Sequence, residues 1–313
     1  MAETTGITRE DSVQKTIETA RKRRAEYAAK PSIGERFVVP RSGLSLDGGE
    51  KQGVNTLLYF PKNHNPSKDG KLPVLFNMHG GAWVGGDAML MESFCRMLAD
   101  QVPIMVVNVN YTKADERPFP YAQEEVADSV CYFAENAVEY GIDVEKMAVG
   151  GHSAGAHLAA GAAMMLKERG VRLALQMLVY PCLDLASTNL EGIFDMVGPF
   201  LFPQEGEREW TTKHRWASPL LATDEELADL PPAIFIECGP DFLKPMGIQY
   251  AKRLIDLGIP IKIKEYPLAE HGFLEVNRPE YPDGDDRKTP EQAIYCNDCE
   301  RYLVAELRAS LLG

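Results

Sequence analysis

The sequence predicts an α/β protein whose sheet is parallel and covered by helices. Short runs of Val, Ile, Leu and Met lack the polar alternation of half-exposed strands, which indicates strands buried on both faces. Helical stretches separate these runs, as in a parallel sheet with right-handed crossovers. A chain of 313 residues can bury a substantial core, and we expect a single domain, 1–313.

Each element follows from its own run of residues. Strands are expected, in chain order, at 54–60, 74–78, 104–109, 147–149, 173–179, 234–237 and 261–266. Helices are expected at 10–29, 89–100, 122–140, 154–168, 244–257 and 291–311. The first helix is rich in Arg, Lys, Glu and Ala, and it ends before Pro31.

The stretch between Val179 and Ile234 interrupts this alternation. It contains aromatic, proline and acidic residues but no clear strand. We interpret about 185–225 as an insertion over the sheet that forms a small cap, or lid, together with residues 1–35. The alternative is an ordinary pair of connecting helices.

The composition and charge of the sequence argue against some classes of binding partner. The formal net charge is −13 and the sequence pI is near 5.0, so the surface repels nucleic acid and anionic membranes. No run approaches the ~18 apolar residues that span a bilayer, and the polar N-terminal residues do not resemble a signal peptide. The six cysteines are scattered, which suits a reducing compartment. We therefore expect a cytoplasmic protein without nucleic-acid or membrane partners.

Cys296 and Cys299 form a C-x-x-C pair, a spacing also used in zinc and redox sites. Such sites need a second ligand pair, or a position that opens a helix after a strand. Here the pair lies inside the last expected helix, where both thiols face one side. This pattern favours packing against the core, and no metal or cofactor site is expected.

Ser153 is the candidate nucleophile. It lies in the sequence GHSAG at 151–155, between an apolar strand and a small-residue helix. A G-x-S-x-G motif acquires meaning in this strand–turn–helix context, because small flanking residues let the two elements approach closely. The helix that follows directs its N-terminal N–H groups toward negative charge forming beside the hydroxyl.

Other strand ends supply the partners that a nucleophilic serine needs. In an open parallel sheet, functional residues gather beyond the carboxyl ends of the strands. The residues found there, in chain order, are Gly80 and Gly81, Ser153, Asp241, and His271. The order of nucleophile, acid and base is the one expected of an α/β-hydrolase.

Roles follow from the flow of charge. His271 is the expected base that accepts the proton of Ser153, and Asp241 is expected to orient the imidazole and stabilise its charged form. The oxyanion requires preorganised N–H donors, and losing one such donor typically costs ~10²–10³ in rate. The expected donors are the N–H groups of Gly80, Gly81 and Ala154.

Alternatives exist for some of these roles. Asp184 and Glu237 compete with Asp241 for the acid, although Asp184 falls at the start of the insertion and suits a structural hydrogen bond better. His79 lacks a second metal ligand at usable spacing, so we interpret it as orienting the glycine turn. Trp83 is expected to pack rather than to contact substrate.

These motifs resemble the hormone-sensitive-lipase-like branch of the α/β-hydrolases, also called the bacterial acetyl-esterase branch. The similarity covers about residues 72–273. It is carried by HGGAWVGGD at 79–87, GHSAG at 151–155, GPDFL at 239–243 and HGF at 271–273. Ala82 stands where the branch usually has a third glycine, and Asn110 replaces its usual Asp.

The resemblance implies an eight-stranded, mostly parallel α/β-hydrolase sheet with a cap from the N-terminus and an insertion. It implies a serine carboxylester hydrolase acting on short acyl esters without a cofactor, with small carbohydrate esters among the substrate candidates. The alternatives are an arylformamidase-like amidase and, from a different class, a non-catalytic small-molecule binder. The expected partner is a small-molecule ester, and the chain is a candidate homo-oligomer.

Overall fold

One mixed sheet organises the chain. The computed structural model describes residues 9–64, 70–187, 191–203 and 208–313. The sheet has eight strands in the order β1-β2-β4-β3-β5-β6-β7-β8. The strands are β1 (Glu35–Val39), β2 (Val54–Tyr59), β3 (Leu72–Met78), β4 (Met105–Val109), β5 (Ile142–His152), β6 (Leu175–Val179), β7 (Ala233–Cys238) and β8 (Ile261–Tyr266).

The sheet is parallel from β4 to β8 and antiparallel at β1 and β2. This arrangement confirms the expected mostly parallel, eight-stranded α/β-hydrolase sheet. The central strands β3, β4 and β6 are buried at every residue, as their unalternating apolar runs predict. Strand β1 was not expected, because this edge strand is largely exposed and therefore carries little apolar pattern.

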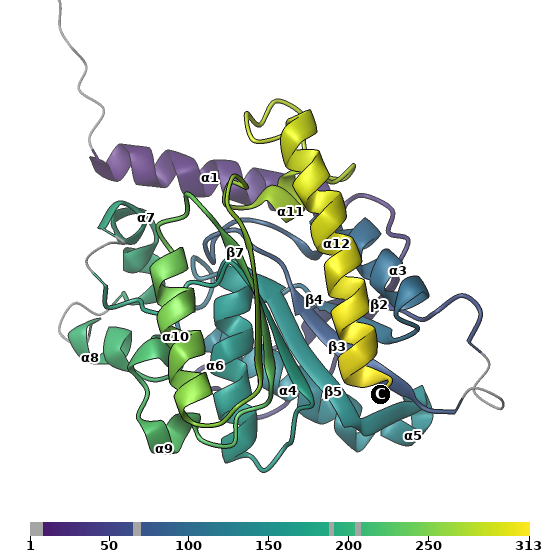
Figure 1. Ribbon diagram of the computed structural model, residues 1–313. Coiled ribbons are helices and arrows are strands. Elements are labelled where there is room, and N and C mark those ends of the chain that lie inside the picture. The colour runs from purple at the N-terminus through teal and green to yellow at the C-terminus, as the bar shows by residue number, and fades with distance from the viewer. Residues whose placement is uncertain (1–8, 65–69, 188–190, 204–207) are drawn as a thin grey trace, which may run out of the picture.

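Helices cover both faces of the sheet (Figure 1). One core cluster joins α4, α6 and α10 to the sheet, and the other joins α3 and α12 to the opposite face. The helices are α1 (Arg9–Ala28), η1 (Ala88–Met91), α3 (Glu92–Gln101), α4 (Tyr121–Glu135), α5 (Ala137–Tyr140), α6 (Ala154–Glu168), α7 (Glu191–Leu201), α8 (Arg208–Lys213), η4 (Pro219–Leu221), α9 (Asp224–Leu227), α10 (Lys244–Asp256), α11 (Phe273–Val276) and α12 (Pro290–Leu311).

Three expected elements have different bounds. The helix expected at 122–140 is interrupted at Asn136, whose amide donates to Tyr132 O at 2.7 Å, so α4 and the short α5 replace it. The helix expected at 89–100 begins as the 3₁₀ turn η1, capped by the side chain of Asp87. The strand expected at 147–149 extends in β5 back to Ile142, over residues too exposed to form an apolar run.

Helix α1 lies across the top of the molecule as drawn in Figure 1, near α7 and α11. Ile17 is buried at 1% exposure and fastens the helix to the core. Arg24 adds a two-point contact with Asp115, at 2.9 and 3.0 Å. Residues 1–8, 188–190 and 204–207 of the expected cap lie outside the described residues.

Cys296 and Cys299 both lie on the buried side of α12, as free thiols in the second core cluster. Their surroundings agree with the packing interpretation. Among the described residues, no group of three or more His, Cys, Asp and Glu side chains could hold a metal ion.

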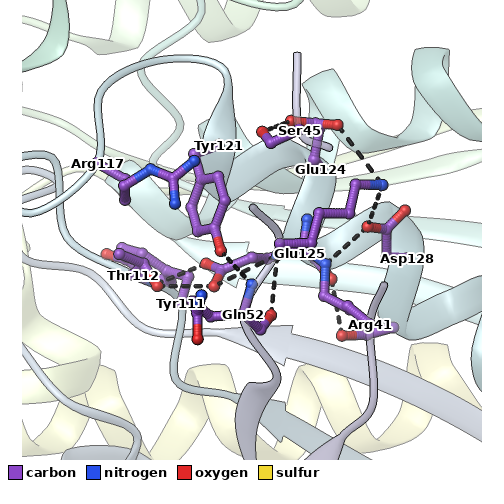
Figure 2. Close-up of polar contacts among 12 residues, drawn as sticks. Arg41, Ser45, Gln52, Tyr111, Thr112, Arg117, Tyr121, Glu124, Glu125 and Asp128 are labelled. Atoms are coloured by element: carbon purple, nitrogen blue, oxygen red, sulfur yellow. Dashed lines mark hydrogen bonds and ion pairs between the residues drawn. The ribbon is translucent and has the colours of Figure 1, made fainter. Parts of the chain in front are cut away.

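A buried polar network joins α4 to the loop between β1 and β2 and to the loop after β4 (Figure 2). Asp128 accepts hydrogen bonds from Arg41 at 2.7 Å and from Lys51 at 2.9 Å. Glu125 accepts two bonds from Thr112, at 2.6 Å from the backbone N–H and 2.7 Å from the hydroxyl. We call this group, with Ser45 and Glu124, the α4 network.

Candidate active site

Ser153 occupies a strained turn between β5 and α6. Its backbone has φ 53° and ψ −115°, a region that side chains rarely adopt. The turn is possible because its flanks are glycines. A Cβ on Gly151 would lie 2.5 Å from the carbonyl of Gly155 and 2.8 Å from Met78 O, closer than real contacts allow. The hydroxyl therefore projects from a junction that β3, β5 and α6 share.

Ser153, His271 and Asp241 form a hydrogen-bonded chain. Ser153 Oγ lies 2.8 Å from His271 Nε2, and His271 Nδ1 lies 2.6 Å from Asp241 Oδ2. An ionised carboxylate can only accept a hydrogen bond, so Nδ1 carries the proton and Nε2 is free to accept one from the serine. The other Asp241 oxygen accepts the N–H of Leu243 at 2.9 Å, which fixes the carboxylate in the turn after β7.

The two alternative acids lie elsewhere. Asp184 accepts the N–H of Ala186 at 2.9 Å, which is a local turn contact. Glu237 is fully buried in β7, and burial together with the charge of Asp241 raises its pKa to about 9. A carboxyl that stays protonated cannot stabilise an imidazolium, so the geometry favours Asp241.

The glycine turn after β3 lies beside the serine. Gly81 has φ 128°, and a Cβ there would collide with the backbone of Gly85. In the described part of the chain, none of the hydrogen bonds uses the N–H of Gly80, Gly81 or Ala154. These groups are therefore available to a negatively charged oxygen near the serine.

His79 stabilises this glycine turn by a hydrogen bond to its backbone. Its ring is fully buried and stacks on Tyr111, with centroids 4.4 Å apart and an interplanar angle of 16°. Nδ1 lies 2.6 Å from Gly80 O and must donate to it, because a carbonyl only accepts. Burial lowers the pKa of His79, so the ring is neutral and acts as the orienting group that its position in the sequence predicts.

Trp83 is buried beside the turn and also lines the cavity described below, so its expected packing role stays a prediction. Its indole is 5% exposed and donates to His157 Nδ1 at 3.0 Å. His157 in turn donates from Nε2 to Ala217 O at 2.9 Å. The chain of bonds ties the glycine turn to α6 and to the segment before η4.

Three residues at the site were not identified from the sequence. The ring of Tyr180 lies 4.8 Å from that of His271, and its hydroxyl donates to the buried carboxyl of Glu275. Burial raises the pKa of Glu275, which favours its neutral form beside Gly80. Arg287 donates to His271 O at 2.9 Å. The strand-end rule could have identified Tyr180, which directly follows β6, but no sequence signal connects Arg287 to His271.

A cavity of about 680 Å³ opens above the serine. Its floor includes Ser153, His271 and the glycine turn, while α1 forms its roof. Apolar side chains line much of the rest: Leu90, Met91, Cys182, Met196, Phe242, Leu243 and Val276. A small organic molecule fits such a space, with its reacting group against Ser153.

The chain is similar to known proteins over most of its length. A family model described as an alpha/beta hydrolase fold matches residues 75–275. The esterase LipI of Mycobacterium tuberculosis is 30% identical over 271 residues, which cover 84% of this chain and 83% of that protein. An arylesterase of Saccharolobus solfataricus is 32% identical over 206 residues, 63% of this chain and 67% of that protein.

Solved structures show the same fold. An esterase from Pyrobaculum calidifontis superposes with a TM-score of 0.75 at 25% identity, covering 98% of this chain and 95% of the other. A bacterial heroin esterase also has a TM-score of 0.75, at 26% identity, covering 97% of this chain and 93% of the other. No helix among the described residues is long and apolar enough to cross a membrane.

Proposed function

The chain belongs to the alpha/beta hydrolase family, and from that premise we propose that it cleaves short-chain acyl esters through an acyl-enzyme on Ser153. It is a hydrolase of the carboxylesterase kind, since several of its relatives and structural neighbours are named esterases. The observation that carries the proposal is the chain of hydrogen bonds from Ser153 through His271 to Asp241. This chain of hydrogen bonds ends at the floor of the cavity, near the N–H groups of Gly80, Gly81 and Ala154.

In the first half-reaction, His271 Nε2 takes the hydroxyl proton as Ser153 Oγ bonds to the ester carbonyl carbon. The carbonyl electron pair moves to oxygen, and the N–H groups of Gly80, Gly81 and Ala154 stabilise that charge. The tetrahedral intermediate then collapses, the C–O bond to the alcohol breaks, and the imidazolium returns its proton to the leaving alcohol. The acyl group remains on Ser153.

In the second half-reaction, water replaces the alcohol. His271 takes a proton from the water as the water oxygen attacks the acyl carbon. The bond between that carbon and Ser153 Oγ then breaks, and His271 returns the proton to Ser153 Oγ. Throughout, Asp241 holds the proton on Nδ1 and balances the positive charge of the imidazolium. No cofactor enters either half-reaction.

The residues that α1 contributes to the cavity favour a substrate whose alcohol group is polar. Helix α1 places Thr16 and Thr19 among the lining residues, beside its basic side chains. Acetyl esters of small carbohydrates combine a short acyl group with such an alcohol, so they belong to the proposed substrate class. We assign α1 and the 185–225 segment to a cap on a single domain spanning 1–313.

A chain-length series tests the proposal. Hydrolysis of 4-nitrophenyl acetate, butyrate, octanoate and palmitate is measured for the wild type and for Ser153→Ala. We expect kcat/KM to be highest for acetate or butyrate and the variant to be inactive. Activity that rises toward palmitate contradicts the short-chain assignment, and full activity in the variant contradicts the nucleophile.

Two further measurements address the alternative functions. N-formylkynurenine is compared with 4-nitrophenyl acetate at equal concentration, and preferred cleavage of the amide would support an arylformamidase-like amidase. A serine-directed phosphonate should form an adduct at Ser153, located by peptide mass spectrometry. Absence of both the adduct and all hydrolysis would support a binding protein.

A further inference from the structure

We propose that the preferred ester carries an anionic group, such as a carboxylate, that binds under α1 beside Lys15 and Arg23. This inference rests on the proposed esterase function and specifies its substrate class. The cavity provides an apolar, reactive floor, and its roof is cationic. A substrate that matches both surfaces has its ester at Ser153 and its negative charge at the helix.

The face that α1 turns to the cavity is unusual for a cover over an ester site. Lys15, Thr19, Arg23 and Tyr27 recur every four residues and all line the cavity. Residues at this spacing share one side of a helix. A helix that only covered an apolar acyl chain would present apolar residues at these positions, whereas this one presents two cations, the hydroxyl of Thr19 and the aromatic ring of Tyr27.

The charge balance of the cavity is opposite to that of the chain. The whole sequence has 46 acidic and 33 basic residues. Among the described residues that line the cavity, the only carboxyl is Glu275, which is buried against Tyr180. The basic side chains in the same lining are Lys15, Arg23, Arg24 and Arg287.

Two of these cations already have partners. Arg24 pairs with Asp115 at 2.9 Å, and Arg287 pairs with Asp285 at 2.6 Å. Lys15 and Arg23 are exposed and form no ion pair or side-chain hydrogen bond within the described ranges. Neither side chain is therefore held by a partner among the described residues, and both can reach a ligand.

Arg23 and Tyr27 lie four residues apart on α1 and both line the cavity, so they share one side of the helix. Lys15 is eight residues before Arg23 on α1, about 12 Å along the helix axis. The two cations therefore lie at separate points along the roof. An anionic group on either the acyl side or the alcohol side of the ester can reach one of them.

The expected effect is on association and binding rather than on the chemical step. Charges lining a concave, low-dielectric cleft can raise on-rates by ~10–10³ at low ionic strength. Exposed charges are screened by salt, with a Debye length of about 10 Å at 0.1 M. A preference of about tenfold in kcat/KM at low salt, shrinking at 0.5 M salt, is therefore expected.

Matched substrates test the proposal. 4-Acetoxybenzoate and its methyl ester differ by one charge on the alcohol side. Mono-4-nitrophenyl succinate and its methyl ester differ by one charge on the acyl side, after correction for spontaneous hydrolysis. We expect Lys15→Gln/Arg23→Gln to lower kcat/KM about tenfold for an anionic ester and less than twofold for its neutral partner. An effect in one pair alone identifies the side of the substrate that carries the charge.

Lys22→Gln is the matched control, because Lys22 is exposed on the same helix but is not among the described residues that line the cavity. It should leave every ratio unchanged. Equal kcat/KM for anionic and neutral esters in the wild type, or equal losses in the double variant, would overturn the anion site while leaving the esterase function intact. Inactivity of the wild type toward both the neutral and the anionic esters would instead contradict the esterase proposal itself.

Discussion

The candidate active site and the α4 network are both built from hydrogen-bonded charged side chains, yet they treat their polar groups differently. In the α4 network, carboxylates have several donors: Asp128 alone accepts from Arg41, Lys51 and Arg169. At the active site, a single line of bonds connects Asp241 to Ser153, and nearby N–H groups are unused. Carboxylates that accept from several donors hold segments of the fold together, whereas N–H groups without an acceptor can bind a reacting group.

The largest expected effect comes from removing the nucleophile. Ser153→Ala should lower kcat by about 10⁴–10⁶, because the acyl-enzyme can no longer form. Its melting temperature should stay within a few degrees of the wild type. Steady-state kinetics with 4-nitrophenyl acetate and a thermal melt measure both quantities.

The matched variant in the α4 network is Ser45→Ala, whose hydroxyl donates to Glu124. It should keep the wild-type kcat and lose about 1 kcal/mol of unfolding free energy. If Ser153→Ala lost mainly stability, or Ser45→Ala mainly activity, the contrast between the two regions would not hold.

The next effect concerns the acid. Asp241→Asn should lower kcat by roughly 10⁴, because an amide that donates to Nδ1 favours the wrong imidazole tautomer. Asp184→Asn provides the comparison, since Asp184 accepts only a local turn N–H in the described structure. It should retain kcat within about twofold. A large loss in Asp184→Asn and a small one in Asp241→Asn would reverse the assignment.

An effect on stability is expected from Arg41→Met. The Arg41 side chain lies 2.7 Å from Asp128 and 3.8 Å from Glu125, and it is 1% exposed. Removing Arg41 takes one of three donors from Asp128 and a nearby cation from Glu125, so the unfolding free energy should fall by about 1.5–3 kcal/mol. Urea denaturation measures this loss, while kcat/KM of the folded enzyme should change less than twofold.

Arg172→Met is the matched control, because Arg172 is exposed and has no ion pair in the described part of the chain. Its unfolding free energy should equal that of the wild type. Equal stability of the two variants would mean that the α4 network contributes nothing to the fold.

The last effect is a dependence of stability on pH. Burial raises the pKa of Glu125 to about 7, whereas a Glu in the unfolded chain has a pKa of ~4.3. The folded state therefore holds a proton that the unfolded state releases between these values. This contribution to stability is fully present below the unfolded pKa and is lost as pH rises through about 7.

The shift corresponds to at most about 3 kcal/mol between pH 4 and 8. Urea denaturation of the wild type, Glu125→Gln and the exposed control Glu145→Gln at both pH values measures it. Glu125→Gln should lose part of this pH dependence, and Glu145→Gln should keep it. If the stability of the wild type and that of Glu125→Gln changed equally between pH 4 and 8, the raised pKa of Glu125 would be contradicted.

The sequence was informative where local rules apply. The apolar runs predict the central strands, and the strand-end rule selects Ser153, Asp241 and His271, of which His271 lies within hydrogen-bonding distance of the other two. Each of these signals depends on a residue and its immediate neighbours. This is why the architecture, and a set of three residues that the structure brings together, could be predicted from the sequence.

Contacts between distant segments could not be predicted in this way. Arg287 reaches His271 from a loop, and Arg41 reaches Glu125 across 84 positions, with no motif at either end. Strand β1 was missed because it is mostly exposed and depends on pairing with β2. The cationic face of α1 is visible as a basic helix, but only its tertiary position shows that this face lies over the serine.

Gly155 has a consequence for recognising active members among similar chains. A Cβ at this position would lie 2.5 Å from His79 O and closer still to Met78 O, so even an alanine would push α6 away from the end of β3. The Ser153 hydroxyl lies at the start of α6, whereas two of the proposed oxyanion donors, the N–H groups of Gly80 and Gly81, follow β3. A relative could thus retain serine, histidine and aspartate yet be catalytically silent because of one additional methyl group.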